Sequence, residues 1–237
     1  CMGCIVIADK IFETYPSFRR GIVIARRMKN KTADEDLYYV LKETLIRRFE
    51  NPVDLETDSR ITDWKDVHKS FSSNPNKFPP AHIALLKRIQ KQRTEIPFIN
   101  SVVAVMNTVS VEHVLPVGGD DITAPESTYK LTYSEGNETF IPLGTPDKTE
   151  NPDKGEVIYL IDETKDVMCR RWNWRNGDKT KITENTVNII MNIDAVGEGS
   201  EERAEKARDA VALMLEKYCG AEIIKTMLSP VYSRHDF

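Results

Sequence analysis

The first 95 residues alternate between short apolar runs and longer segments with helical spacing. The runs CIVI and GIVIARR predict two buried strands, because each starts with consecutive apolar residues. The later segments repeat apolar residues every three to four positions, as one face of a helix does. They predict helices over about Ala33–Glu50 and Ser59–Phe71 and another starting near Pro79–Pro80.

The second part of the chain changes from helical spacing to strand patterns. The segment from Asn100 to about Val109 is apolar nearly all round, which predicts a helix buried between layers. Gly118–Gly119 predicts a tight turn. From Tyr129 onward, strands dominate, with a hairpin turn at EGNE, a final helix capped by Ser200 and a last strand, AEIIKTML. This order indicates an α+β fold, with a mixed, largely antiparallel, sandwich-like sheet core and packed helices.

Length and charge narrow the class of protein. A chain of 237 residues with 40% hydrophobic residues can bury the core of one large domain or two small ones. A net charge of −4 argues against non-specific coating of nucleic acid, but leaves room for a local basic groove, because salt confines charge effects to about 10 Å. No apolar run reaches the ~20 residues that span a bilayer, and the opening apolar segment is too short for a signal peptide. We therefore expect a cytoplasmic protein without a membrane partner.

The cysteines and histidines predict no metal site and no cofactor. Cys1 and Cys4 have CxxC spacing, but no second pair completes a zinc site. The histidines lack metal-ligand spacing, and the chain has neither a Rossmann glycine motif nor a P-loop. Cys169 is most simply a buried strand residue, and we expect reduced thiols.

The segment VMCRRWNWRNGDKTKITENTVN, Val167–Asn188, carries the most distinctive chemistry. If it starts as a strand, its two tryptophans lie on one face and its alternating arginines and asparagine on the other. Aromatic rings and guanidinium groups beside a glycine-containing turn suit contacts to phosphates and bases. The alternative is a core strand with inward tryptophans and solvated arginines. A second basic group, Lys87–Arg93, suggests either a solvated helix face or further phosphate contacts.

Several segments together resemble the tRNA-binding editing domain of the phenylalanyl-tRNA synthetase beta subunit: INSVVAVMNTVSVEHVLPVGGDD, IPLG, KGEVIYLIDE and CRRWNWRNGDKTKITENTVNIIMNIDAV. The resemblance spans roughly Ile96–Val196 and is closer still to free-standing relatives of that domain, which share the RRWNWR and DKTKIT patterns. It implies an N-terminal αβ extension, residues 1–95, docked on an editing-domain-like core, residues 96–237, as one compact unit. No ATP-dependent ligase module is indicated.

This resemblance implies a stand-alone domain that hydrolyses mischarged aminoacyl-tRNA in trans and so supports translation fidelity. Its expected partner is the acceptor end of tRNA, with no DNA partner; the amino acid and the oligomeric state are not indicated. The family's pocket uses a histidine and a glutamate, whose positions fall on Gly118 and Asp178 here. The alternative is a non-catalytic module that binds tRNA or an amino-acid-like ligand.

Hydrolysis of an aminoacyl ester needs positioned water and oxyanion stabilisation rather than a nucleophilic triad. Asp178 is therefore the candidate to accept a proton from water or to hold the substrate ammonium, and Gly118 and Gly119 can offer backbone N–H groups to the oxyanion. The candidate substrate- and tRNA-binding residues are Arg171, Trp172, Asn173, Trp174, Arg175, Lys179 and Thr180. Each candidate has a structural alternative, as a turn cap, a turn or part of the core.

Overall fold

The computed structural model describes residues 3–92 and 96–237 and contains two sheets packed face to face. The first sheet has six strands, in the order β10-β1-β4-β5-β6-β7. Its strands are β1 (Cys4–Ile7), β4 (Thr128–Tyr133), β5 (Val157–Ile161), β6 (Asp166–Arg170), β7 (Arg175–Asn176) and β10 (Arg234–Asp236). The second sheet has four strands, in the order β3-β8-β2-β9. They are β2 (Arg19–Arg26), β3 (Val117–Asp121), β8 (Ile189–Ala195) and β9 (Glu222–Leu228).

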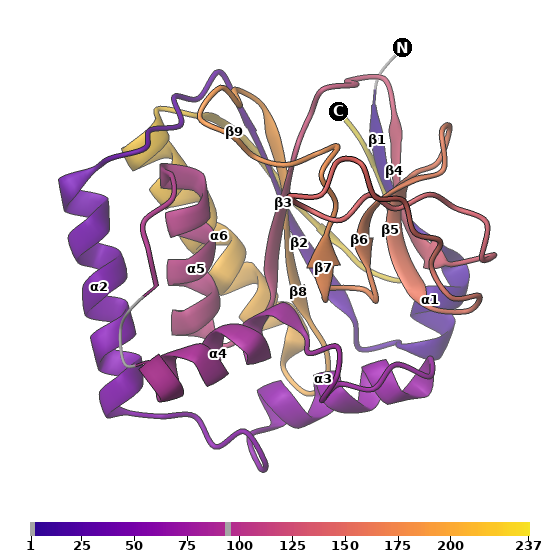
Figure 1. The fold of residues 1–237 in the computed structure, drawn as a ribbon, viewed down its shortest axis with the longest axis horizontal. Coiled ribbons are helices and arrows are strands. Elements are labelled where there is room, and N and C mark those ends of the chain that lie inside the picture. Colours follow the sequence, from indigo (N-terminus) through magenta and orange to yellow (C-terminus); the bar gives the residue numbers. More distant parts are fainter. Residues whose placement is uncertain (1–2, 93–95) are drawn as a thin grey trace.

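Helices form a third layer and close one end of the sandwich (Figure 1). Their bounds are α1 (Asp9–Thr14), α2 (Glu35–Glu50), α3 (Ser59–Ser70), α4 (Ala81–Gln92), α5 (Ser101–His113) and α6 (Ser200–Cys219). Figure 1 shows α2, α5 and α6 on the side of the four-stranded sheet that faces away from the six-stranded sheet. Helices α3 and α4 run along the lower end of the sandwich in this view. Among the described residues, no helix is long and apolar enough to cross a membrane.

The alternation of side chains along β2 separates two hydrophobic cores. Ile22 and Ile24 belong to the core between the two sheets, whereas Val23 and Ala25 belong to the core under α2, α5 and α6. All four side chains are fully buried. The continuous apolar run that predicted a buried strand therefore reflects a strand that is covered on both faces.

The α+β class and most of the predicted helices are confirmed. Helix α2 starts after Asp34, whose carboxylate accepts a hydrogen bond from the Leu37 backbone N–H (3.0 Å). Helix α5 is the predicted buried helix, and the Asn100 side chain caps it by accepting from the Val103 N–H (2.9 Å). Ser200 does not cap α6: that helix starts after Gly199, and the Ser200 hydroxyl donates to the Ser17 carbonyl instead.

Gly118 and Gly119 do not form the predicted tight turn, because both lie within β3, which pairs antiparallel with β8. A Cβ on Gly119 would meet the Met191 sulfur at 2.5 Å, so close packing favours glycine there. The predicted EGNE hairpin is also wrong, since residues 134–156 connect β4 to β5 as a long loop with isolated bridges.

The strands after Tyr129 do not form one sheet. Strands β4–β7 and β10 belong to the six-stranded sheet, and β8 and β9 belong to the four-stranded sheet. The first 95 residues supply a strand to each sheet, β1 beside β4 and β2 between β8 and β9. The division into an extension and a core at residue 95 stays a prediction, but strands from both sides of that position share each sheet.

Two fully buried histidines join α4 to α3 and α3 to the β6–β7 loop. In the Nε2–H tautomers, His82 donates to the Arg60 carbonyl (3.0 Å) and His68 donates to Asn173 Oδ1 (2.7 Å). Burial lowers the pKa of each imidazole to about 4 from its ordinary value of 6.5. Both side chains are therefore neutral in the folded protein at physiological pH.

We expect stability to fall as the pH drops from 6.5 to about 4, because the unfolded histidines then bind protons that the folded ones do not. A shift of this size corresponds to roughly 3 kcal/mol per histidine. His82→Gln keeps a neutral donor and should remove about half of this dependence in denaturant unfolding measured at several pH values, because His68 still contributes. His235→Gln, a change at a partly exposed surface histidine, should leave the dependence intact. Equal pH profiles for His82→Gln and the parent protein would contradict the assignment.

Candidate functional site

Polar side chains interrupt the core between the sheets at one end of the four-stranded sheet. Arg20 is paired with Asp194 across β2 and β8, and Gly118 is paired with Asn192 across β3 and β8. Side chains two residues apart on a strand point to the same face of a sheet, so Arg20 shares a face with Ile22 and Ile24, and Asn192 and Asp194 share it with Ile190. These isoleucines belong to the core between the sheets. The same face of the sheet is therefore apolar along one part and polar along the next.

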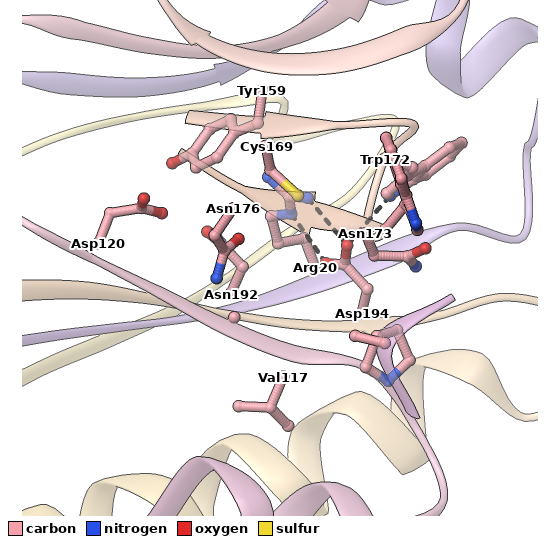
Figure 2. Close-up of a pocket in the computed structure, with 14 residues that line it drawn as sticks. Arg20, Val117, Asp120, Tyr159, Cys169, Trp172, Asn173, Asn176, Asn192 and Asp194 are labelled. Atoms are coloured by element: carbon pink, nitrogen blue, oxygen red, sulfur yellow. Dashed lines mark hydrogen bonds and ion pairs between the residues drawn. The ribbon is translucent and has the colours of Figure 1, made fainter. Parts of the chain in front are cut away.

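These polar residues line a cavity of about 80 Å³ between the two sheets (Figure 2). The four-stranded sheet and the segment before β3 supply one wall, consisting of Arg20, Pro116, Val117, Gly118, Asp120, Asn192 and Asp194. The six-stranded sheet and its β6–β7 loop supply the other wall, together with the start of α4: Tyr159, Cys169, Trp172, Asn173, Trp174, Asn176 and Ala81. We call this cavity the intersheet pocket.

A buried ion pair forms the base of the intersheet pocket. Arg20 donates from Nε and Nη2 to the two carboxylate oxygens of Asp194, both at 2.8 Å. The indole N–H of Trp172 donates to the same carboxylate (3.1 Å), and Figure 2 shows the contacts converging on Asp194. The remaining nitrogen of Arg20, Nη1, is buried and has no hydrogen-bond partner among the described residues.

Asp120 brings a second carboxyl group into the intersheet pocket. It is buried and accepts a hydrogen bond from the Thr180 hydroxyl (2.7 Å). Burial raises the pKa of Asp120 to about 7, although the Thr180 hydrogen bond and the charge of Arg20 oppose the shift. Near neutral pH this carboxyl group therefore exists in both protonation states and can accept or donate a proton.

The residues between β6 and β7 form a tight loop rather than the predicted continuous strand. Arg171 and Trp172 both have left-handed backbones, with φ of 48° and 64°. Strand β7 then returns antiparallel beside β6, pairing Arg175 with Arg170. The expected alternation of tryptophans and arginines on opposite faces is therefore wrong in this segment.

Trp172 is a core residue, as the structural alternative proposed. Its side chain is 2% exposed, and its ring makes edge contacts with Tyr15, Phe18 and Trp64 at centroid distances of 4.9–5.2 Å. The indole ring is thus enclosed and unavailable for stacking on a base, so Trp172 does not take the base-contacting role suggested for the aromatic rings of this segment. Trp174 is half-buried and packs edge-on against Phe78 at 4.7 Å.

The predicted basic surface is largely neutralised by acidic partners. Arg171 is buried, donates to Asp153 (2.8 Å) and to the Ser73 hydroxyl (3.1 Å), and so is not a free phosphate-binding group. Lys179 pairs with Asp166 at 2.7 Å. Arg175 is the more accessible arginine, with its side chain 39% exposed and 4.0 Å from a carboxylate oxygen of Glu150. In the second basic group, Arg93 lies outside the described residues.

Asp178 lies in the turn after β7. Its carboxylate accepts from the Gly144 N–H (3.0 Å) and from Lys181 (3.3 Å), and these contacts hold its pKa below the ordinary value. It is not among the described residues that line the intersheet pocket, so its catalytic role stays a prediction.

The β3 glycines and the segment around Asp178 meet in space, although Asp178 itself is not among the described residues that line either cavity. Besides the Thr180–Asp120 hydrogen bond, the Asp121 N–H donates to the Thr180 carbonyl (2.9 Å). Gly118 lines the intersheet pocket, whereas Gly119 lines a second cavity of about 100 Å³ with Gly177 and Lys181, the neighbours of Asp178. The two cavities share Asp120 and Asn176.

Most of this site was missed at the sequence level, since only Gly118, Trp172, Asn173 and Trp174 of its lining residues were candidates. Among the polar residues that were missed, Tyr159, Asn192 and Asp194 lie in segments that we had assigned to strands, whereas Arg20, Asp120 and Asn176 lie outside them. A usable signal was present in NIIMNIDAV, where asparagine and aspartate fall at the same alternate positions as core residues.

These features define an α+β domain with a polar pocket between two sheets. Residues 63–220, more than half of the chain, match the B3/4 domain family, and the chain belongs to that family. An N-terminal fragment of the phenylalanyl-tRNA synthetase beta subunit from Pyrococcus horikoshii is similar over 95% of this chain and 54% of that one, with 12% identity and a TM-score of 0.45. This chain thus spans about half the length of that fragment. No curated protein matches.

Removing one partner of the Arg20–Asp194 pair should strongly destabilise the fold. Arg20→Met leaves a buried carboxylate without its cation, and we expect a loss of roughly 3–5 kcal/mol in denaturant unfolding. Arg20→Met combined with Asp194→Leu removes both charges and should recover part of that loss. Lys206→Met, which breaks an exposed pair with Glu202, is the control and should change stability little. A double variant that lost the sum of both single losses would contradict this account.

Proposed function

We propose that this chain is an editing-related domain that binds the aminoacyl end of tRNA and hydrolyses mischarged aminoacyl-tRNA. Membership of the B3/4 domain family, a domain of phenylalanyl-tRNA synthetase beta subunits, supports the proposal. The observation that carries it is the intersheet pocket, because every lining residue except Arg20 lies within the matched residues 63–220. A buried pocket with fixed polar groups is the usual form of a site for a small ligand group.

The chemistry requires a positioned ester and a proton acceptor, since the aminoacyl ester is already activated. Asp120 is the stronger candidate for the base, because it lines the intersheet pocket and has a pKa of about 7, close to the working pH of a general base. Asp178 is the alternative candidate for the base. It lies two residues before Thr180, whose hydroxyl donates a hydrogen bond to Asp120. A Cβ on Gly118 would meet nothing within 4 Å, so a substrate has room to approach the backbone there.

Binding of tRNA is assigned to the cations of this segment that stay accessible. Arg175 is partly exposed and follows Trp174 of the pocket wall, and Lys181 is exposed and lines the second cavity. Their acidic partners weaken but do not remove their attraction for phosphate, because exposed ion pairs are worth little in water. Arg171 instead acts structurally through Ser73 and Asp153.

Charge reversal should separate the cations that bind tRNA from Arg171, which stabilises the fold. We expect the double variant Arg175→Glu with Lys181→Glu to bind tRNA more weakly. The slope of log Kd against the logarithm of the salt concentration should fall by about one for each phosphate contact that is lost. Unfolding of this double variant should stay close to that of the parent. Arg171→Glu should destabilise the fold, because it places a carboxylate beside Asp153 and Glu156. Parent-like tRNA affinity and salt dependence in the double variant would exclude these cations from the interface.

Deacylation of a panel of mischarged tRNAs tests the reaction itself. If Asp120 is the base, Asp120→Asn should lower the rate about 10²–10⁴-fold with tRNA binding retained, and the parent rate should rise with pH through about 7. Asp178→Asn is the matched variant for the alternative assignment. A rate that falls only in Asp178→Asn would move the base to Asp178. A parent protein that binds tRNA but hydrolyses no member of the panel would favour the non-catalytic binding module.

A further inference from the structure

The intersheet pocket is small and its walls are fixed. Its volume of about 80 Å³ is about half of the ~150 Å³ of a cavity that holds a benzene ring. Part of its wall is held in place by Trp172, which is enclosed by aromatic rings, and by the Arg20–Asp194 pair. In this conformation the pocket is therefore smaller than a cavity that holds a phenyl ring.

Four buried polar atoms on residues that line the intersheet pocket lack hydrogen-bond partners among the described residues. Arg20 Nη1 and Asn173 Nδ2 are donors, Asn192 Oδ1 is an acceptor, and the Tyr159 hydroxyl is both. Unpaired buried polar groups are rare in folded proteins because each loses its hydrogen bonds to water. Their concentration in one pocket points to a ligand group that both donates and accepts.

Asn173 turns its amide oxygen toward His68, and this contact fixes the tautomer of the imidazole. His68 lies 2.7 Å from Asn173 Oδ1 and is neutral, so as the Nε2–H tautomer it donates to that oxygen and leaves the amide nitrogen without a partner. A helix from the first 95 residues thus sets the hydrogen-bonding character of a residue in the pocket wall.

The charges in the intersheet pocket disfavour an anionic ligand group. Arg20 is already neutralised by two hydrogen bonds to Asp194, so an added anion would meet Asp194 and Asp120 rather than a free cation. Lysine and arginine side chains, moreover, are too long for a cavity of about 80 Å³.

We propose that the intersheet pocket selects aminoacyl groups with small, uncharged side chains that both donate and accept hydrogen bonds, namely hydroxyl or carboxamide side chains. The inference rests on the proposed function and specifies its substrate class. A site that hydrogen-bonds a polar group of its substrate strongly rejects an analogue that lacks this group. An apolar pocket discriminates much less between two substrates that differ only in size. The pocket should therefore distinguish serine from alanine, threonine from valine and asparagine from leucine.

The test uses the full chain and one tRNA charged in turn with serine, threonine, asparagine, alanine, valine, leucine, aspartate and tyrosine. We expect kcat/KM for at least one polar member to exceed that of its apolar counterpart by about 10²-fold or more, with tyrosine and aspartate also disfavoured. Faster hydrolysis of tyrosyl- or valyl-tRNA than of all polar members would overturn the substrate class and leave the deacylase function standing.

Non-hydrolysable 3′-aminoacylamino-adenosines with the same side chains separate selection from catalysis. A preference for the polar members in calorimetric binding, without hydrolysis of any tRNA, would keep the substrate class and overturn the deacylase function. Binding of none of these analogues, together with no hydrolysis, would overturn both assignments of the pocket.

Two matched variants test the pocket atoms directly. Tyr159→Phe removes a hydroxyl without a partner, so the fold should stay as stable or become more stable while the polar-to-apolar ratio of kcat/KM falls about tenfold or more. Tyr129→Phe is the control, because Tyr129 is equally buried but donates to the Ala124 carbonyl and does not line the pocket. An unchanged ratio in Tyr159→Phe, or an equal drop in both variants, would contradict the role of the Tyr159 hydroxyl.

Discussion

The buried pair between Arg20 and Asp194 is the interaction on which the rest of the site depends. It joins β2 to β8 with two charge-assisted hydrogen bonds, and Trp172 attaches the β6–β7 loop of the other sheet to the same carboxylate. Two charges in the core are tolerated only when each is paired and hydrogen-bonded. The Trp172–Asp194 hydrogen bond therefore links the two sheets where the hydrophobic core gives way to the intersheet pocket, and the Arg20–Asp194 pair fixes the carboxylate that accepts it.

The β6–β7 loop is held in a conformation that its own sequence does not favour. Two consecutive non-glycine residues, Arg171 and Trp172, adopt left-handed backbones, which cost about 1–3 kcal/mol each. The contacts of Arg171 with Ser73 and Asp153 and the aromatic cage around Trp172 offset that cost. As a result Asn173 is placed in the pocket wall, next to His68 of α3. Helix α3 and the segment after it thus support this loop.

The arginine- and tryptophan-rich segment predicted a binding surface, and the structure divides its residues among different roles. Trp172 and Arg171 are buried and support the loop, Asn173 and Trp174 line the pocket, and Arg175 remains partly exposed. Thr180 contributes by holding Asp120, the carboxyl group that the sequence interpretation missed. Composition correctly drew attention to the segment, but it carried no information about which acidic side chains would lie nearby.

The sequence by itself determined the α+β class, most of the helices and the central apolar strands, because hydrophobic periodicity acts over a few residues. Helices α2 and α5 and strands β2 and β9 follow from such local patterns. Only the tertiary structure decided the pocket, because its key partners are far apart in the chain: 174 residues separate Arg20 from Asp194, and 60 separate Asp120 from Thr180. Those pairs depend on strand register and on the packing of two sheets, which no local pattern specifies.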